Sequence, residues 1–125
     1  MGTDSGEDKI LLDENILKDL KLIMEDEFTE VLHVYLEESV GLMSKIHQAF
    51  EESPDSVARL AHALKSCSNN VGAVHLSKIA EEIRQKLMDD NLSAAEDTLI
   101  ELEDVFTKTH AQVKKYLQNC IDKVA

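Results

Sequence analysis

The sequence predicts an all-α protein: an antiparallel up-down four-helix bundle with a short additional helix at its N-terminal end. The chain of 125 residues is long enough for one domain with a sizeable core, and 43% of its residues are apolar. One proline and four glycines interrupt it, so long helices are favoured over many short strands. Apolar residues recur at spacings of three and four, which is the period of an amphipathic helix.

The N-terminal residues 1–9 are polar and acidic, and we expect a flexible tail before a domain that spans residues 10–125. Asp13 is placed to cap a short first helix, because its carboxylate can accept hydrogen bonds from the free amides of the first turn. The apolar positions of this helix are Ile16, Leu17, Leu20 and Ile23.

A long amphipathic helix is predicted from residue 26 to residue 51, where apolar side chains follow the helical period over seven turns. Ser53 and Pro54 end it and start the third helix, because proline is tolerated at the first helical position. The third helix is predicted over residues 55–71. Gly72 then supplies a left-handed cap.

A fourth helix is predicted over residues 74–88, and the polar run 89–91 breaks it. Ser93 and Glu96 have the spacing of a capping box at the start of the last helix. The apolar positions of that helix alternate between three and four residues, so we expect a left-handed, bundle-like crossing. They are Leu92, Ala95, Leu99, Leu102, Phe106, Thr109, Val113, Tyr116 and Cys120.

Composition excludes several classes of function. A net charge of −12 disfavours binding to nucleic acid or to an anionic membrane, since each requires a basic surface. No apolar run has the roughly 18 residues of a membrane span, and the N-terminus does not resemble a signal peptide. Cys67 and Cys120 lack metal-ligand spacing and are expected as reduced core thiols. We therefore expect a cytoplasmic monomer without metal or cofactor, whose partner is a protein.

The orientation of His62 is the central question for function. When Val57 is placed at the origin of a helical wheel, the apolar residues of the third helix centre at about 335°, whereas His62 falls at about 140°. A histidine nearly opposite the apolar face points into water. Its neighbours on that face are small, with Ala58 one turn before and Ser66 one turn after. The imidazole should therefore be approachable by a bulky partner.

Lys65 and Asn69 lie on the same face of the helix as His62. Because Lys65 is three residues after His62, one cation is within reach of the imidazole. The segment His62-Ala63-Leu64-Lys65-Ser66, with the later Asn70, Gly72 and Ala73, resembles the signature of histidine-containing phosphotransfer (HPt) domains. The usual form of that signature is His-x-x-Lys-Gly followed by Gly-Ala. The resemblance covers residues 11 to 117.

The resemblance implies a four-helix bundle in which His62 accepts a phosphoryl group from an aspartate on one receiver domain, such as that of a hybrid sensor kinase. The group is then passed to the receiver of a response regulator. Lys65 is implied as the phosphate-stabilising residue, and the carrier has no kinase activity of its own. Two departures stand out. Ser66 replaces the usual glycine, and Arg84 stands where the family often has Gln or Glu.

Counting across the predicted turns suggests what surrounds His62. Residues 83 and 84 of the fourth helix should lie level with it, so Arg84 could contact the imidazole, contact the phosphate or merely cover apolar surface. Counting back across Ser53 and Pro54 places part of the second helix at the same level. The receiver-docking rim predicted there consists of Val40, Gly41, Met43, Ser44 and His47, with packing against a neighbouring helix as the alternative for Met43. The other histidines, among them His110, are expected at the surface outside any site.

Two other functions are compatible with a four-helix bundle. A ferritin-like di-metal protein needs Glu-x-x-His pairs on two helices, and Glu30 with His33 is the only such pair. We therefore reject it. The alternative that stays open is an adaptor bundle that binds a receiver or kinase domain without being phosphorylated. Such adaptors would normally lack the histidine or the lysine, and both are present here.

Overall fold

The computed structural model describes residues 10–124, and it confirms the predicted all-α fold. The predicted tail, residues 1–9, lies outside the described residues. The elements in chain order are α2 (Glu14–Met24), the 3-10 turn η1 (Glu25–Glu27), α3 (Phe28–Glu52), α4 (Pro54–Asn70), α5 (Val74–Met88) and α6 (Leu92–Val124).

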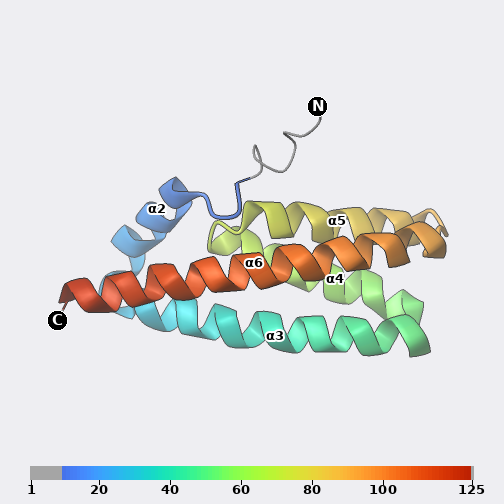
Figure 1. The fold of residues 1–125 in the computed structure, drawn as a ribbon, viewed down its shortest axis with the longest axis horizontal. Coiled ribbons are helices and arrows are strands. Elements are labelled where there is room, and N and C mark those ends of the chain that lie inside the picture. Colours follow the sequence, from blue (N-terminus) through green and yellow to red (C-terminus); the bar gives the residue numbers. More distant parts are fainter. Residues whose placement is uncertain (1–9, 125) are drawn as a thin grey trace.

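The four long helices lie side by side along the long axis of the molecule, and α2 slants across one end (Figure 1). Helix α4 packs against α3 and α5, and α6 completes the ring by packing against α5 and α3. Each helix connects to the next through a short turn, so neighbours in the chain are antiparallel. Because α4 packs between α3 and α5, one of its faces is left for solvent.

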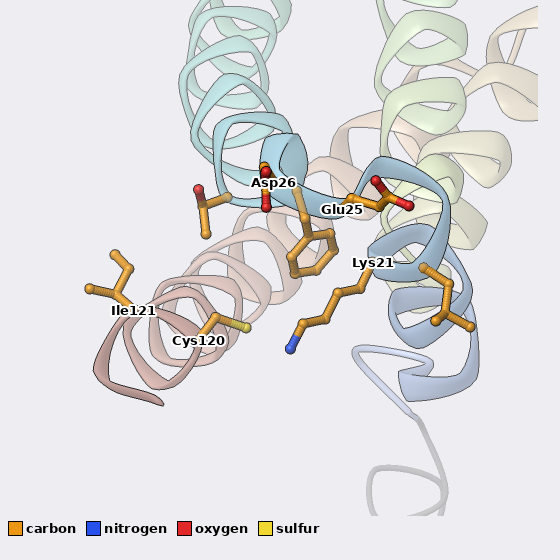
Figure 2. A pocket seen from close by; sticks show the side chains of 8 residues that line it. Lys21, Glu25, Asp26, Cys120 and Ile121 are labelled. Atoms are coloured by element: carbon orange, nitrogen blue, oxygen red, sulfur yellow. The ribbon is translucent and has the colours of Figure 1, made fainter. Parts of the chain in front are cut away.

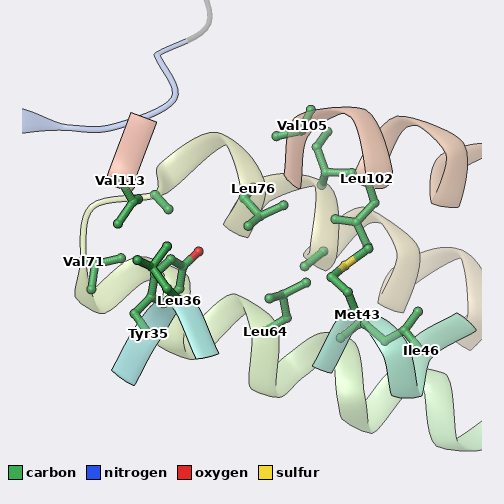
Figure 3. Packing of buried hydrophobic residues seen from close by; sticks show 14 of the residues in the cluster. Tyr35, Leu36, Met43, Ile46, Leu64, Val71, Leu76, Leu102, Val105 and Val113 are labelled. Carbon is green, nitrogen blue, oxygen red and sulfur yellow. The ribbon is translucent and has the colours of Figure 1, made fainter. Parts of the chain in front are cut away.

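The core lies along the bundle axis and receives side chains from every long helix (Figure 3). Burying one large aliphatic side chain contributes about 1.5–3 kcal/mol to the free energy of unfolding. Fully buried examples are Leu32, Ile46, Leu64, Leu76, Ile83 and Leu102. A buried polar pair is also satisfied, since the Tyr35 hydroxyl and Ser68 Oγ are 2.9 Å apart. Burial raises the pKa of the Tyr35 phenol, so this bond between α3 and α4 stays uncharged.

Most of the predicted helix ends are confirmed. Asp13 Oδ1 accepts a hydrogen bond of 3.0 Å from the backbone amide of Asn15 at the start of α2. Pro54 is the first residue of α4, and Gly72 has the left-handed φ of 79° that favours glycine after a helix.

The predicted capping box of Ser93 and Glu96 is wrong. The last helix begins at Leu92, and Asn91 Oδ1 accepts the hydrogen bond from the amide of Ala94 at 3.1 Å. The reason is how α5 ends: Asp90 takes a φ of 59°, and the Asn91 amide donates back to a carbonyl of the last turn of α5. Asn91 therefore ends one helix and caps the next. In α2, Ile23 was predicted on the buried face but is exposed.

The turn between α4 and α5 is anchored to the start of α2. The Gly72 carbonyl accepts a hydrogen bond of 2.8 Å from the amide of Asp13. A Cβ atom at Gly72 would lie only 2.8 Å from the Asp13 carbonyl oxygen and 3.3 Å from Ile16 Cβ. Glycine is thus required here both by its φ and by the closeness of α2.

Gly72→Ala should lower the free energy of unfolding by roughly 1–2 kcal/mol from the left-handed backbone alone, and further through the clash with Asp13. Gly41→Ala is the matched control. A Cβ atom at Gly41 would meet nothing within 4 Å in the middle of α3, so this change should raise stability by up to about 1 kcal/mol. Urea unfolding followed by circular dichroism measures both. Equal effects of the two substitutions would contradict the role of the turn.

Candidate functional site

His62 lies on the outer face of α4 and is exposed, as the helical wheel predicted. Ser66, one turn further along α4, and Asn69 are exposed on the same face, while Ala58 is half-buried. None of these side chains is long enough to cover the imidazole. The outer face of α4 therefore offers His62 to a large partner.

On the α5 side of His62 lies an ionic cluster formed by Lys65, Glu81 and Arg84. Lys65 Nζ lies 3.2 Å from Glu81 Oε1. Arg84 Nε donates to the same oxygen at 3.0 Å, and Arg84 Nη2 donates to Oε2 at 2.9 Å. The three side chains are 27–33% exposed, so the cluster lies at the edge of the protein where solvent and partners reach it.

The pairing within the cluster shows the register of α4 against α5. The two helices are antiparallel, and Lys65 pairs with Glu81. His62, three residues before Lys65, therefore lies level with Arg84, three residues after Glu81. The sequence predicted the same level for these two residues. The hydrogen bonds of Arg84, however, go to Glu81 and to the Met88 sulfur.

The Glu81 carboxyl is strongly acidic in this setting. Hydrogen bonds from Arg84, then from Gln85 and Lys65, lower its pKa from 4.5 to about 2. It is therefore a carboxylate at any physiological pH. The cluster combines two cations with one permanent anion, which leaves the flank of His62 with a net positive charge on an otherwise acidic protein.

On the other side of α4, a groove of about 390 Å³ runs between α3 and α4. We call it the α3–α4 groove; it is lined by Glu38, Gly41, Leu42, Lys45, Ala63 and Cys67. Gly41 widens it because no side chain projects there. Cys67 was predicted as a core thiol but is only half-buried, and burial raises its pKa to about 11. The thiol is therefore protonated and weakly reactive.

Part of the predicted docking rim is misplaced. Met43 is only 6% exposed and lies among the buried side chains of the core (Figure 3), so it is wrong as a rim residue. On a helical wheel of α3, each residue advances by 100°, and Ile46 marks the centre of the buried face. Gly41 and Lys45 then fall on the flank that faces α4, where both line the α3–α4 groove. Ser44 is exposed on the outer side of the helix.

Val40 and His47 are exposed but lie on the opposite flank of α3, toward α6. His47 Nε2 is 2.6 Å from Glu103 Oε2 on that helix. Their predicted position beside His62 is therefore wrong. His110 of α6 was predicted at the surface, but it is half-buried, and its Nε2 lies 3.2 Å from the Leu36 carbonyl oxygen.

Two residues near His62 did not emerge from the sequence analysis. Arg59 is exposed one turn before His62. Its position three residues before the histidine could have identified it from the sequence as a neighbour on the same face. Glu81 could have been found by the same count across the Gly72 turn that placed Arg84. Asn70 is exposed at the end of α4, and Gly72 ends that helix as predicted.

A wider groove lies elsewhere. Its volume is about 820 Å³, and it is lined by α2, η1, the start of α3 and the C-terminal part of α6, including Lys21, Cys120 and Ile121 (Figure 2). It contains no residue of the His62 face. Within residues 10–124, no three His, Cys, Asp or Glu side chains are grouped to hold a metal ion, and no helix is long and apolar enough to cross a membrane.

The comparisons with known proteins agree with this geometry. A sequence profile described as "Hpt domain" matches residues 30–125. The structure is similar to histidine-containing phosphotransfer protein B from Pseudomonas aeruginosa, with a TM-score of 0.83 and 25% identity, covering 87% of this chain and 96% of that one. No curated protein sequence matches the chain.

Two plant proteins share the fold. A putative histidine-containing phosphotransfer protein from rice gives a TM-score of 0.75 at 22% identity, covering 89% of this chain and 85% of that one. A histidine-containing phosphotransfer protein from maize gives 0.76 at 21% identity, covering 86% and 90%.

The ionic cluster predicts an unusual titration. In carbon-detected NMR, the Glu81 carboxyl should titrate near pH 2, and Arg84→Met should move its pKa back toward 4.5 because the largest cause of the shift is removed. Since the folded pKa is depressed, the stabilisation is present above about pH 4.5 and is lost as the pH falls toward 2. Lys65→Met should have a smaller effect. A wild-type titration near pH 4.5 would contradict the cluster.

Proposed function

The chain belongs to the Hpt domain family of histidine phosphotransfer proteins, and we propose that His62 is its phosphoryl acceptor. The observation that carries this proposal is an exposed imidazole with small neighbours on its own helix and two cations beside it. Three residues of the family signature support the proposal: His62 is exposed, Lys65 pairs with Glu81 across the α4–α5 boundary, and Gly72 has a left-handed backbone.

The reaction is a transfer between two nucleophiles. A neutral imidazole nitrogen of His62 attacks the phosphorus of an aspartyl phosphate on a receiver domain. A P–N bond forms while the P–O bond to the aspartate breaks, and the electron pair leaves on the aspartate carboxylate. The ring keeps the proton on its other nitrogen. Attack by the aspartate of a second receiver reverses these steps and passes the group on.

Charge neutralisation is the contribution of the neighbouring side chains. Phosphoryl transfer spreads negative charge over three equatorial oxygens, and it depends on positioning and on nearby cations. Lys65 is one turn from His62 on the same helix, and Arg84 lies level with it on α5. The proposed roles are that Lys65 contacts the phosphoryl oxygens and that Arg84 supports them from the side of α5.

The phosphoryl donor is proposed to be a receiver domain rather than ATP. The sequence contains no Gly-rich phosphate loop and no Walker motif. The protein therefore acts as a phosphocarrier between a receiver of a hybrid sensor kinase and that of a response regulator. Family resemblance implies that the receiver brings an acidic pocket, and the cations Arg59, Lys65 and Arg84 around His62 are complementary to such a pocket.

The docking surface is proposed to extend from His62 across α4 to the α3–α4 groove. This groove replaces the rim predicted from the sequence, with Gly41 as the one rim residue in common. Leu42, Ala63 and Cys67 make part of it apolar, and the exposed Ala63 is the chain neighbour of His62 on α4. A small apolar area beside a charged centre suits a transient complex.

Replacing the acceptor should abolish labelling without unfolding the protein. His62→Gln should take up no phosphoryl group from a phosphorylated receiver, while its melting temperature stays near the wild-type value because an exposed side chain is changed. His33→Gln is the matched control, since His33 is an exposed histidine on α3 and should be labelled normally. Acid-labile radiolabel on gels is the measurement. Binding of the receiver without any label on the wild type would favour the adaptor alternative.

Filling the space beside His62 should impair docking. Ser66→Arg adds a long cation one turn from the imidazole and should weaken receiver binding roughly tenfold, about 1.4 kcal/mol. Gln112→Arg introduces the same side chain at an exposed position of α6 and should leave the Kd unchanged. Isothermal titration calorimetry with an unphosphorylated receiver measures both. Equal affinities for the two variants would refute the docking surface.

A further inference from the structure

Glu81 accepts four hydrogen bonds, three of them from Lys65 and Arg84, the two cations assigned to the phosphoryl site. Oε1 accepts from Lys65 Nζ at 3.2 Å and from Arg84 Nε at 3.0 Å. Oε2 accepts from Arg84 Nη2 at 2.9 Å and from Gln85 Nε2 at 2.8 Å. A carboxylate on α5 thus holds the lysine of α4 and the arginine that lies level with His62.

Phosphorylation of His62 would bring a second anion to the same cations. A phosphoryl group carries about −1.5 to −2 charges at neutral pH and has three acceptor oxygens. Lys65 has a flexible stem and one ammonium group, so turning toward the phosphoryl oxygens draws it away from Glu81. Glu81 is fixed to α5 one turn from Arg84, and it remains as a like charge near the new anion.

We propose, on the premise that His62 is the acceptor, that Glu81 is a positioning residue that competes with the phosphoryl group for Lys65 and Arg84. In the unphosphorylated protein it holds both cations at the site. In the phosphorylated protein it weakens their hold on the phosphoryl group, which raises the free energy of phosphohistidine. The competition favours onward transfer to the next receiver over storage of the group on this chain.

The partly exposed position of the cluster favours this role over a purely structural link between α4 and α5. Ion pairs with partly exposed side chains contribute little to stability, because water competes for both charges. Water can therefore take the place of Glu81 on Lys65 and Arg84 when these cations turn toward a phosphoryl group. Within the described helices, α4 and α5 are already held together by the buried residues Val57, Leu64, Leu76 and Ile83.

Glu81→Gln removes the charge and keeps the shape of the side chain. Wild type and variant are each brought to equilibrium with a receiver domain that has been phosphorylated with acetyl phosphate and freed of excess donor. The ratio of phosphorylated chain to phosphorylated receiver should rise by roughly threefold to tenfold in the variant. Asp104→Asn is the control: it removes one negative charge from an exposed ion pair with Lys108 on α6, and it should leave the ratio unchanged.

A second measurement, made on the wild-type protein, tests the proposal even if Glu81→Gln folds poorly. In the wild-type protein, the Arg84 Nε–H resonance should move when the histidine is phosphorylated with potassium phosphoramidate, because the Glu81 bonds rearrange. An unchanged or lower ratio in Glu81→Gln, or an Arg84 resonance that stays in place, would overturn the competition while leaving the acceptor role of His62 intact. A wild-type chain that takes no phosphoryl group on His62 would overturn both proposals.

Discussion

The antiparallel register of α4 and α5 is the constraint on which the site depends. This register is set by the turn at residues 71–73. Gly72 adopts a left-handed backbone there, and the start of α2 lies too close to leave room for a side chain at position 72. The bond from the Asp13 amide to the Gly72 carbonyl ties the N-terminal helix to the same turn. Once this turn is fixed, Lys65 meets Glu81, and Arg84 lies level with His62. A shift of one residue would rotate these partners by about 100° around their helices and disperse them.

The two flanks of His62 have different physical character, and each serves a different part of the proposed relay. The α5 flank is ionic, with two cations and one carboxylate whose low pKa keeps it charged. This flank acts on the phosphoryl group. The α3 flank is a shallow groove opened by Gly41 and lined by the half-buried Cys67. It offers surface for a partner, so chemistry and docking meet at the outer face of α4.

Much of this arrangement could be predicted from the sequence, because helical periodicity and turn residues determine it locally. The exposure of His62 followed from the wheel of a single helix, and Gly72 followed from its position after the last apolar turn. The cap at Asn91 was missed because Asn91 and Ser93 are both good capping residues. The choice between them depends on how the last turn of α5 ends, which involves the backbone of Asp90.

The docking rim was misplaced for a different reason. Periodicity locates the centre of the buried face of α3, but the handedness of the bundle decides which flank meets α4 and which meets α6. Val40 and His47 lie on the α6 flank, as the contact between His47 and Glu103 demonstrates. Met43 lies nearer the centre of the apolar face and is buried by the closing of the ring. Only the three-dimensional packing supplies this information.

Phosphoryl transfer to this chain forms one covalent bond, and locating that bond is the most direct test of the role of His62. The wild-type chain, incubated with a phosphorylated receiver, can be studied by two-dimensional phosphorus–proton NMR, which correlates the phosphorus nucleus with the ring protons of the histidine that carries it. The chain has five histidines, so the correlated ring protons identify which of them carries the phosphoryl group. If His62 is the acceptor, a phosphoramidate signal will correlate with the ring of His62 alone. A correlation with any other histidine, or receiver binding without a phosphoramidate signal, would contradict this role.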